Sequence, residues 1–215
     1  MSRLAKRVGD RVAAAGLLVL FSPVFAGVAV WILVDDGRPV LLAQERVGKN
    51  GRRFRMLKFR TMVPNAIEVG RTLKLSDDPY AIVPNDPRIT RAGRFLRRSG
   101  LDELPQLWNV LRGEMSIVGP RPDVVEQVAN YSDHDRGRLA VEPGITGWSQ
   151  VNGREEITWP ERIEQDLWYI EHWSLGLDVK IMLRTVGQFR RTGEQPVVDT
   201  MNIERARARE KAEST

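Results

Sequence analysis

The feature that most limits how this chain can fold is an uncharged, mostly apolar run close to its N-terminus. The run extends from Val12 to Val34 and comprises 23 of the 215 residues. As a helix it would be about 35 Å long, against a hydrocarbon core of roughly 30 Å. It lacks a convincing small-residue cleavage site, which favours a retained anchor over a removed signal peptide. The sequence therefore predicts a membrane anchor within residues 1–37.

The dipeptide Ser22-Pro23 lies almost at the centre of this run and leaves its topology open. Proline removes a helical hydrogen bond and clashes with the preceding turn, while the Ser22 hydroxyl can satisfy a freed carbonyl. Basic residues flank the run on both sides, four within residues 1–11 and five within residues 38–53. A straight span would leave one of these clusters outside the cytoplasm. The residues alone allow either a kinked transmembrane helix or a re-entrant helix with both ends in the cytoplasm.

The composition of the chain restricts its chemistry. It contains no cysteine and only two histidines, His134 and His172. Disulfides, thiolate nucleophiles and cysteine-based zinc sites are excluded, and a histidine-centred triad is disfavoured. Acid–base and nucleophilic chemistry therefore falls to carboxylates, lysines and hydroxyls. The formal charge of +5 predicts an anionic partner, but charge alone does not choose among nucleic acid, anionic lipid and a phosphorylated substrate.

After the anchor, residues 38–200 have the size of one catalytic domain. We expect an α+β fold, compact and mostly helical, with a small β-hairpin around Lys49-Asn50-Gly51. A strand is predicted at 116–118, a proline-rich loop at 77–88, and helices near 90–98, 102–112, 123–131, 159–172 and 177–191. The tail, residues 201–215, is charged and is expected to be a frayed helix or disordered.

An acidic pair, Asp102-Glu103, opens the segment LDELPQLWNVLRGEMSIVGPRP at residues 101–122. At a helix N-terminus the dipole favours an ionised carboxylate, and an ionised Asp102 could attack phosphorus. Glu103 could hold a metal, assist proton transfer or position the acceptor. Acidic residues also commonly cap helices, and the residues alone keep that simpler explanation open.

Several cationic side chains could face the acidic pair. Arg121 lies between two prolines, which restrict its backbone, and its guanidinium suits bidentate recognition of phosphate. A cradle for a diphosphate could be extended by Lys58, Arg60, Arg97 and Arg154. A solvated basic surface explains the same residues. Magnesium is the expected ion, because it bridges phosphate oxygens and needs only one or two protein carboxylates.

Three long motifs occur in a fixed order along the chain. They are KFRTM at 58–62, the segment at 101–122, and PGITGWSQVNGR at 143–154. Together with Ser22-Pro23 and DVKIML at 178–183, they make the chain resemble the bacterial sugar transferase family, in its small monotopic phosphoglycosyl transferase form. The resemblance implies transfer of a phosphosugar from a nucleoside diphosphate sugar, usually a UDP-sugar, to polyprenyl phosphate. Nucleoside monophosphate is released and a polyprenyl diphosphosugar is formed.

The resemblance also implies roles for particular residues. Asp102 becomes the covalent nucleophile and a ligand of the required Mg²⁺, and Glu103 becomes its catalytic partner. Arg121, in the matched Pro-Arg-Pro motif, becomes a phosphate or nucleotide contact. Ser22-Pro23 becomes the break of a re-entrant membrane helix in contact with membrane lipid. The protein is then expected to be monotopic in the bacterial inner (cytoplasmic) membrane, with its catalytic domain on the cytoplasmic face.

The resemblance does not predict the sugar or the glycoconjugate pathway, and it leaves an oligomer open. It removes the expectation of a nucleic acid partner. The alternative function is a non-catalytic, membrane-tethered basic module that binds anionic lipid or nucleic acid through the same arginines. The two functions differ in their need for Asp102.

Overall fold

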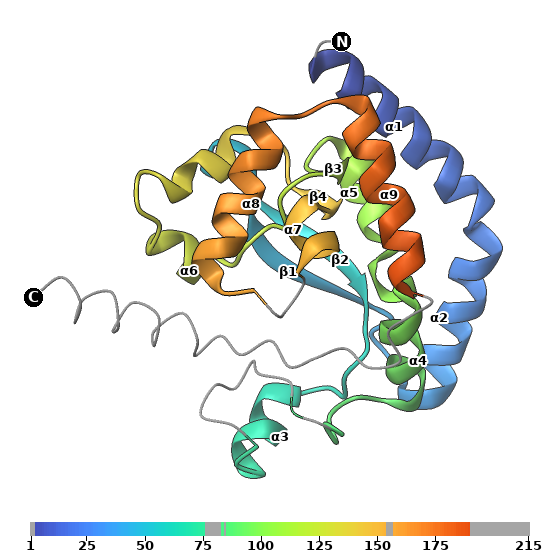
Figure 1. The fold of residues 1–215 in the computed structure, drawn as a ribbon. Coiled ribbons are helices and arrows are strands. Elements are labelled where there is room, and N and C mark those ends of the chain that lie inside the picture. The colour runs from blue at the N-terminus through green and yellow to red at the C-terminus, as the bar shows by residue number, and fades with distance from the viewer. Residues whose placement is uncertain (1–2, 76–82, 84, 154–156, 190–215) are drawn as a thin grey trace, which may run out of the picture.

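The computed structural model describes residues 3–75, 83, 85–153 and 157–189. This part of the chain is mostly helical and contains two small two-stranded sheets, as Figure 1 shows. The predicted mixture of helices with a small hairpin is confirmed in this form. The predicted tail at 201–215 and most of the proline-rich loop at 77–88 lie outside the described residues.

The apolar run folds as two helices, α1 (Arg3–Leu20) and α2 (Ser22–Asp36), which meet at a bend of 60°. The Ser22 hydroxyl donates to the carbonyl of Val19 at 2.8 Å, and Pro23 lies in the first turn of α2, where its missing N–H leaves no bond unmade. In the described residues, neither helix alone has the length and apolar composition to cross a membrane. Taken together, the bent pair does, on those two criteria.

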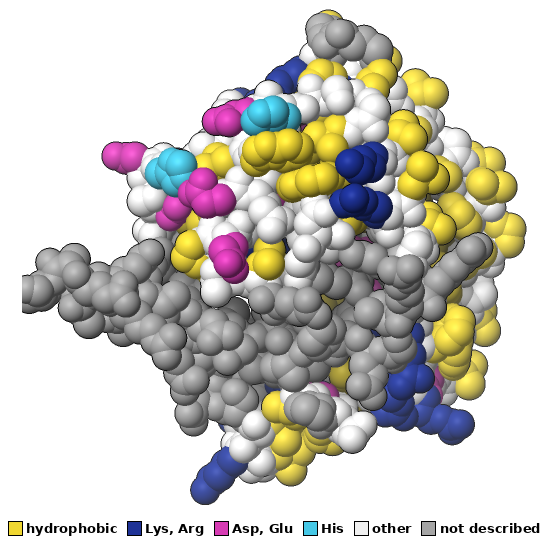
Figure 2. Space-filling view, in the orientation of Figure 1, with side chains coloured by type: hydrophobic (Ala, Val, Ile, Leu, Met, Phe, Trp, Pro, Cys, Tyr) yellow, Lys and Arg dark blue, Asp and Glu magenta, His cyan; other side chains and the backbone are white. Residues whose placement is uncertain are grey.

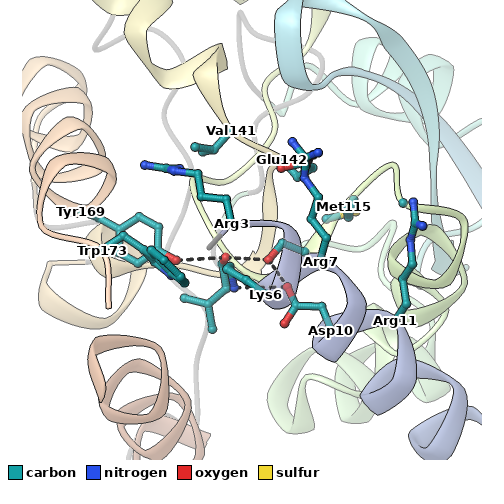
Figure 3. A pocket seen from close by; sticks show the side chains of 13 residues that line it. Arg3, Lys6, Arg7, Asp10, Arg11, Met115, Val141, Glu142, Tyr169 and Trp173 are labelled. Carbon is teal, nitrogen blue, oxygen red and sulfur yellow. Dashed lines mark hydrogen bonds and ion pairs between the residues drawn. The ribbon is translucent and has the colours of Figure 1, made fainter. Parts of the chain in front are cut away.

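The first half of α1 directs its apolar side chains outward and its charged side chains toward the domain. Leu4 is 67% exposed, whereas Lys6 forms an ion pair with Asp178 at 2.7 Å. Asp10 accepts a hydrogen bond from the Ser116 hydroxyl at 2.5 Å. Figure 3 shows charged side chains of α1 lining a pocket between this helix and the domain. Hydrophobic side chains consequently gather along the outer edge formed by α1 and α2 (Figure 2).

Both ends of the bent pair are fixed to the domain. At the far end, Arg60 donates four hydrogen bonds of 2.6–2.8 Å, to the carboxylate and carbonyl of Asp36 and to the carbonyls of Gly37 and Pro39. Asp35 accepts a further bond from a backbone N–H of helix α4 (Arg91–Ser99) at 2.8 Å. Arg60 follows directly on strand β2 (Arg53–Phe59), so it joins the end of α2 to that strand.

The predicted hairpin is confirmed. Strands β1 (Leu41–Val47) and β2 (Arg53–Phe59) pair antiparallel, and a short turn at Lys49–Gly51 connects them. Asn50 and Gly51 have φ values of 55° and 76°, a region that Asn and Gly adopt at low cost. Phe54 and Met56 of β2 enter the core. Lys58 lies at the C-terminal end of the same strand, two residues before Arg60.

The predicted helix over 102–112 is interrupted. Asp102 and Glu103 lie in a separate 3₁₀ turn, η2 (Leu101–Glu103), and helix α5 (Gln106–Arg112) begins only after Pro105. Trp108 of α5 is 48% exposed, because this helix packs against α1 and β2 through Leu107 and its neighbours. The expected helix near 90–98 is confirmed as α4, capped by a threonine hydroxyl that accepts from the backbone N–H of Gly93 at 2.9 Å.

The remaining elements build the other side of the domain. Strands β3 (Ser116–Val118) and β4 (Gly144–Thr146) pair parallel. The helices, in chain order, are α3 (Ala66–Thr72), α6 (Val125–Ala129), η3 (Asp135–Ala140), α7 (Trp148–Asn152), α8 (Trp159–Glu171) and α9 (Leu175–Phe189). The predictions of β3, α6, α8 and α9 are confirmed, whereas β4, α7, α3 and η3 were not predicted. A core of Val118, Val151, Tyr169 and Ile181 joins β3 to helices α7, α8 and α9.

Candidate active site

Glu103 lies between two cations that come from different parts of the fold. Arg121, on the loop after β3, donates from Nη2 to Glu103 Oε1 at 2.8 Å. Lys58, on β2, donates from Nζ to the same oxygen at 3.5 Å. Burial acts to raise the pKa of Glu103, but the charges of Arg121 and Lys58 outweigh it and hold this pKa well below its usual range. Glu103 is therefore ionised at neutral pH.

Asp102 has a different environment from its neighbour. It is 8% exposed, and its Oδ1 atom is buried without accepting a hydrogen bond from the described part of the chain. Burial, followed by the charge of Glu103, raises the pKa of Asp102 to about 6. The expectation that the ionised form of Asp102 would be favoured is not met, because burial and the charge of Glu103 disfavour that form, and the residue lies in a 3₁₀ turn ahead of α5 and not at the N-terminus of that helix. Asp102 is nevertheless mostly ionised above pH 7 and is poorly solvated, which favours its reactivity.

Helix α4 brings Arg97 to the Asp102 side of the cluster. Its Nε donates to the Thr61 hydroxyl at 2.9 Å. Burial lowers the pKa of Arg97, and the charge of Asp102 acts in the opposite direction. Burial likewise lowers the pKa of Lys58, against the charge of Glu103. The acidic pair thus faces cations from β2, α4 and the Pro-Arg-Pro loop.

The structure does not bring every predicted cation to this cluster. It places Lys58, Arg97 and Arg121 around the acidic pair. Arg60 is only 5% exposed and uses its guanidinium on the end of α2, so the expectation that it contacts a diphosphate is not supported. Arg154 lies outside the described residues.

Sequence reasoning missed Arg46, on β1. Its Nη1 donates to the carbonyl of Pro122 at 3.4 Å. Burial, reinforced by the charge of Arg121, lowers the pKa of Arg46 to about 10. It therefore adds a further, half-buried cation beside the Pro-Arg-Pro loop. Its position in the basic run of residues 46–60 was the available signal, but the run contains too many cations for the pattern to single it out.

The acidic pair supplies the oxygen atoms that could bind the expected Mg²⁺. Among the described residues, no cluster of three or more His, Cys, Asp or Glu side chains could hold a metal. Mg²⁺ bound together with substrate phosphates needs only one or two carboxylates. Asp102 Oδ1, buried without a hydrogen-bond donor, fits as such a ligand. The residues present are thus compatible with an ion shared between protein and diphosphate.

The fold and the site together define a class of protein. It has a small helical domain, a bent apolar helix pair fixed to that domain, and a carboxylate pair surrounded by half-buried cations. Such a site is suited to phosphate groups and to a carboxylate nucleophile. The chain belongs to the bacterial sugar transferase family, whose model matches residues 1–192.

Curated relatives agree with this membership. The chain is 42% identical over 194 residues to the UDP-galactose-lipid carrier transferase of Erwinia amylovora. It is 41% identical to the UDP-glucose:undecaprenyl-phosphate glucose-1-phosphate transferase of Escherichia coli strain K12; each alignment covers 86% of this chain and 40% of the relative. An uncharacterized sugar transferase of Bacillus subtilis, EpsL, is 39% identical, with 85% of this chain and 86% of the relative covered. The chain thus spans less than half the length of the first two relatives.

Proposed function

We propose that the protein transfers a phosphosugar from a nucleoside diphosphate sugar, most simply a UDP-sugar, to polyprenyl phosphate. The products are a polyprenyl diphosphosugar and a nucleoside monophosphate. The observation that carries this proposal is the contrast between two adjacent carboxylates. Arg121 and Lys58 balance the negative charge of the ionised Glu103. Asp102, in contrast, has a raised pKa and a buried oxygen that accepts no hydrogen bond from the described residues.

In the first step, Asp102 attacks the phosphorus that carries the sugar. A new bond forms between its carboxylate oxygen and that phosphorus, and the bond from phosphorus to the bridging oxygen breaks. The nucleoside monophosphate leaves with the electron pair of the broken bond. The product on the protein is an acyl phosphate, an aspartyl-phosphosugar intermediate.

In the second step, an oxygen of polyprenyl phosphate attacks the same phosphorus. The acyl-phosphate bond breaks, Asp102 leaves as a carboxylate, and the diphosphate of the product is complete. Lys58, Arg97 and Arg121 provide fixed positive charge where charge develops on the phosphoryl oxygens. Glu103 holds two of these cations in place and balances their charge. When bound, Mg²⁺ would neutralise diphosphate oxygens, with Asp102 as its protein ligand.

The nature of the donor and acceptor is supported by the relatives. Their printed names include UDP-galactose-lipid carrier transferase and UDP-glucose:undecaprenyl-phosphate glucose-1-phosphate transferase. A UDP-hexose and a C55-type polyprenyl phosphate are therefore the first substrates to test. A role in exopolysaccharide assembly agrees with another relative, the exopolysaccharide production protein ExoY of Rhizobium meliloti, which is 40% identical over 190 residues.

The bent helix pair is proposed to lie in one leaflet of the bacterial inner membrane, with the domain on the cytoplasmic face. Two observations support this. The outward face of α1 is apolar even in its first turns, where Leu4 is 67% exposed, as expected of a helix in contact with lipid. Both ends of the pair are also tied to the same domain, through Lys6–Asp178 and Asp36–Arg60, and a domain on one side of a membrane cannot hold both ends of a spanning helix.

The test combines two assays on the full chain in lipid nanodiscs. With UDP-glucose or UDP-galactose and undecaprenyl phosphate, the protein should release UMP, and Asp102→Asn should abolish the release while keeping the thermal midpoint. With donor alone, intact-protein mass spectrometry should detect the added mass of a hexose phosphate, absent in Asp102→Asn. Release of UMP that does not need Asp102 would overturn the mechanism. A basic binding module would release no nucleotide from any donor of a broad panel.

A further inference from the structure

A buried ionic network lies behind the Pro-Arg-Pro loop, outside the acidic pair. Its centre is Arg138, on η3, which is 3% exposed. Arg138 Nη1 donates to Asp123 and to the Tyr131 hydroxyl, the latter at 2.7 Å, and Nη2 donates to Asp166 at 2.6 Å. The two carboxylates are 8% and 1% exposed. One guanidinium therefore joins the loop that carries Asp123 to helix α8, which carries Asp166.

The same guanidinium also reaches the backbone of the active-site loop. Three successive carbonyls of this loop, those of residues 121, 122 and 123, each accept a hydrogen bond. Their donors are, in order, Arg138 Nη2 at 3.3 Å, Arg46 Nη1 at 3.4 Å and the backbone N–H of Val47 at 3.0 Å. The proline on either side of Arg121 further restricts the loop. The backbone of Arg121 is thus held from two sides while its side chain extends to Glu103.

Burying charged side chains costs desolvation free energy. Their desolvation often cancels their attraction, and an apolar replacement of similar volume can be as stable. A guanidinium does, however, offer five donors in a fixed planar fork, which apolar packing cannot replace as a means of fixing orientation. Here the fork binds two carboxylates, a hydroxyl and a carbonyl of the loop at once.

We propose that Arg138 is a positioning residue, which with Asp123 and Asp166 fixes the Pro-Arg-Pro loop so that the guanidinium of Arg121 stays on Glu103 and faces the donor diphosphate. The inference rests on the proposed function for its consequence in catalysis. The structural part of it, the fixing of the loop, stands independently of any substrate.

The two variants that test the proposal most directly are Arg138→Lys and Asp166→Asn. The ammonium of lysine keeps the charge but cannot bridge the same four acceptors, and asparagine removes one anchoring charge at nearly constant volume. Tyr131→Phe removes one donor to Asp123 and one acceptor of Arg138, and it leaves the contacts of Arg138 to Asp123 and Asp166 in place. Ile163→Ala, a buried residue of α8 that is 2% exposed, is the matched control for general destabilisation.

Hydrogen exchange of the loop over residues 119–124 is the first measurement, on the full chain without substrate. Arg138→Lys and Asp166→Asn should raise exchange there about tenfold or more, relative to the rest of the domain. Tyr131→Phe should have a smaller effect, and Ile163→Ala should lower the thermal midpoint without a local change in the loop. Equal exchange in all four variants, or loosening of the loop by Ile163→Ala alone, would overturn the proposal.

Steady-state kinetics are the second measurement. A displaced Arg121 should lower kcat of Arg138→Lys by about 10²-fold, while Ile163→Ala keeps kcat at a temperature where both are folded. If the exchange results hold but kcat is unchanged, the loop is fixed by Arg138 and catalysis does not depend on it, so the proposal fails. If the unaltered protein transfers no phosphosugar, the proposed function fails, and the exchange data still decide whether Arg138 fixes the loop.

Discussion

Arg60 Nη1 donates to Asp36 Oδ2 at 2.6 Å, and this pair joins the last residue of helix α2 to the residue that follows strand β2. Lys58, two residues before Arg60, contacts Glu103. The end of the bent helix pair is therefore connected to the acidic pair through a few residues of one strand.

We predict that Arg60→Gln destabilises the protein. The change leaves Asp36 and three carbonyls of the anchor end without their charged donor, at a position that is 5% exposed. Breaking a buried pair of this kind costs about 3 kcal/mol, or a fall of about 6–12 °C in thermal midpoint for a chain of this size. Differential scanning fluorimetry in detergent would measure it.

The matched control for this prediction is Arg53→Gln, on the same strand. Arg53 pairs with Glu45 at 3.8 Å, and the two side chains are 63% and 57% exposed. Exposed pairs of this kind contribute little, so its thermal midpoint should stay within about 2 °C of the unaltered protein. Equal midpoints for the two variants would contradict the role given to Arg60.

A second prediction concerns Arg121. Replacing it with alanine leaves Glu103 with Lys58 as its one ion-pair partner among the described residues, and removes the guanidinium proposed to face the diphosphate, so kcat/KM for the donor should fall by about 10²–10³-fold. Arg121→Lys should recover only part of this loss, because an ammonium lacks the planar fork. Arg112→Ala removes an exposed arginine that pairs with Glu114 and should leave kcat/KM unchanged. If all three variants behaved alike, a general effect of positive charge would replace the specific contact.

The third prediction is the pH dependence of the first half-reaction, measured as UMP release without acceptor. The raised pKa of Asp102, about 6, means that the nucleophile loses its charge as the pH falls through this value. The rate should therefore rise between pH 5 and pH 7 and level off above, with a midpoint near 6. Omitting polyprenyl phosphate matters, because a phosphomonoester also titrates at about 6.

Two variants should move this midpoint in opposite directions. The negative charge of Glu103 raises the pKa of Asp102, so Glu103→Gln should shift the midpoint to lower pH. The positive charge of Lys58 lowers the pKa of Asp102, so Lys58→Met should shift it to higher pH. Shifts in the same direction, or none, would mean that a group other than Asp102 controls the rate.

The sequence predicted those parts of the site that lie within one local motif, and it did not predict contacts between residues far apart in sequence. The acidic pair and Arg121 stood out because they lie within one motif, and the hairpin because Asn50-Gly51 supplies the required turn. The role of Arg60 was missed, because a basic run does not reveal which cation donates to backbone carbonyls 21–24 residues away in sequence. Strand β4 and helix α7 were missed because a three-residue strand among glycines has the composition of a loop.

The fourth prediction concerns divalent cations. If Asp102 Oδ1 shares Mg²⁺ with the diphosphate, removing divalent ions with EDTA should abolish UMP release, and added Mg²⁺ should restore it. Calorimetry with UDP should show affinity that rises with Mg²⁺ in the unaltered protein and rises less in Asp102→Asn. The same Mg²⁺ dependence of UDP affinity in both proteins would remove Asp102 from the metal site while leaving its role as nucleophile open to the mass measurement.

The last prediction is the topology of the bent helix pair. Since the chain has no cysteine, Ser2→Cys and Arg38→Cys each introduce a unique label on one side of the apolar run. A kinked transmembrane helix would expose one of the two positions outside the cell. A re-entrant pair, held at both ends by Lys6–Asp178 and Asp36–Arg60, keeps both on the cytoplasmic side. An impermeant maleimide should therefore label neither variant in spheroplasts and both after permeabilisation, and outer labelling of either position in intact spheroplasts would contradict the re-entrant arrangement.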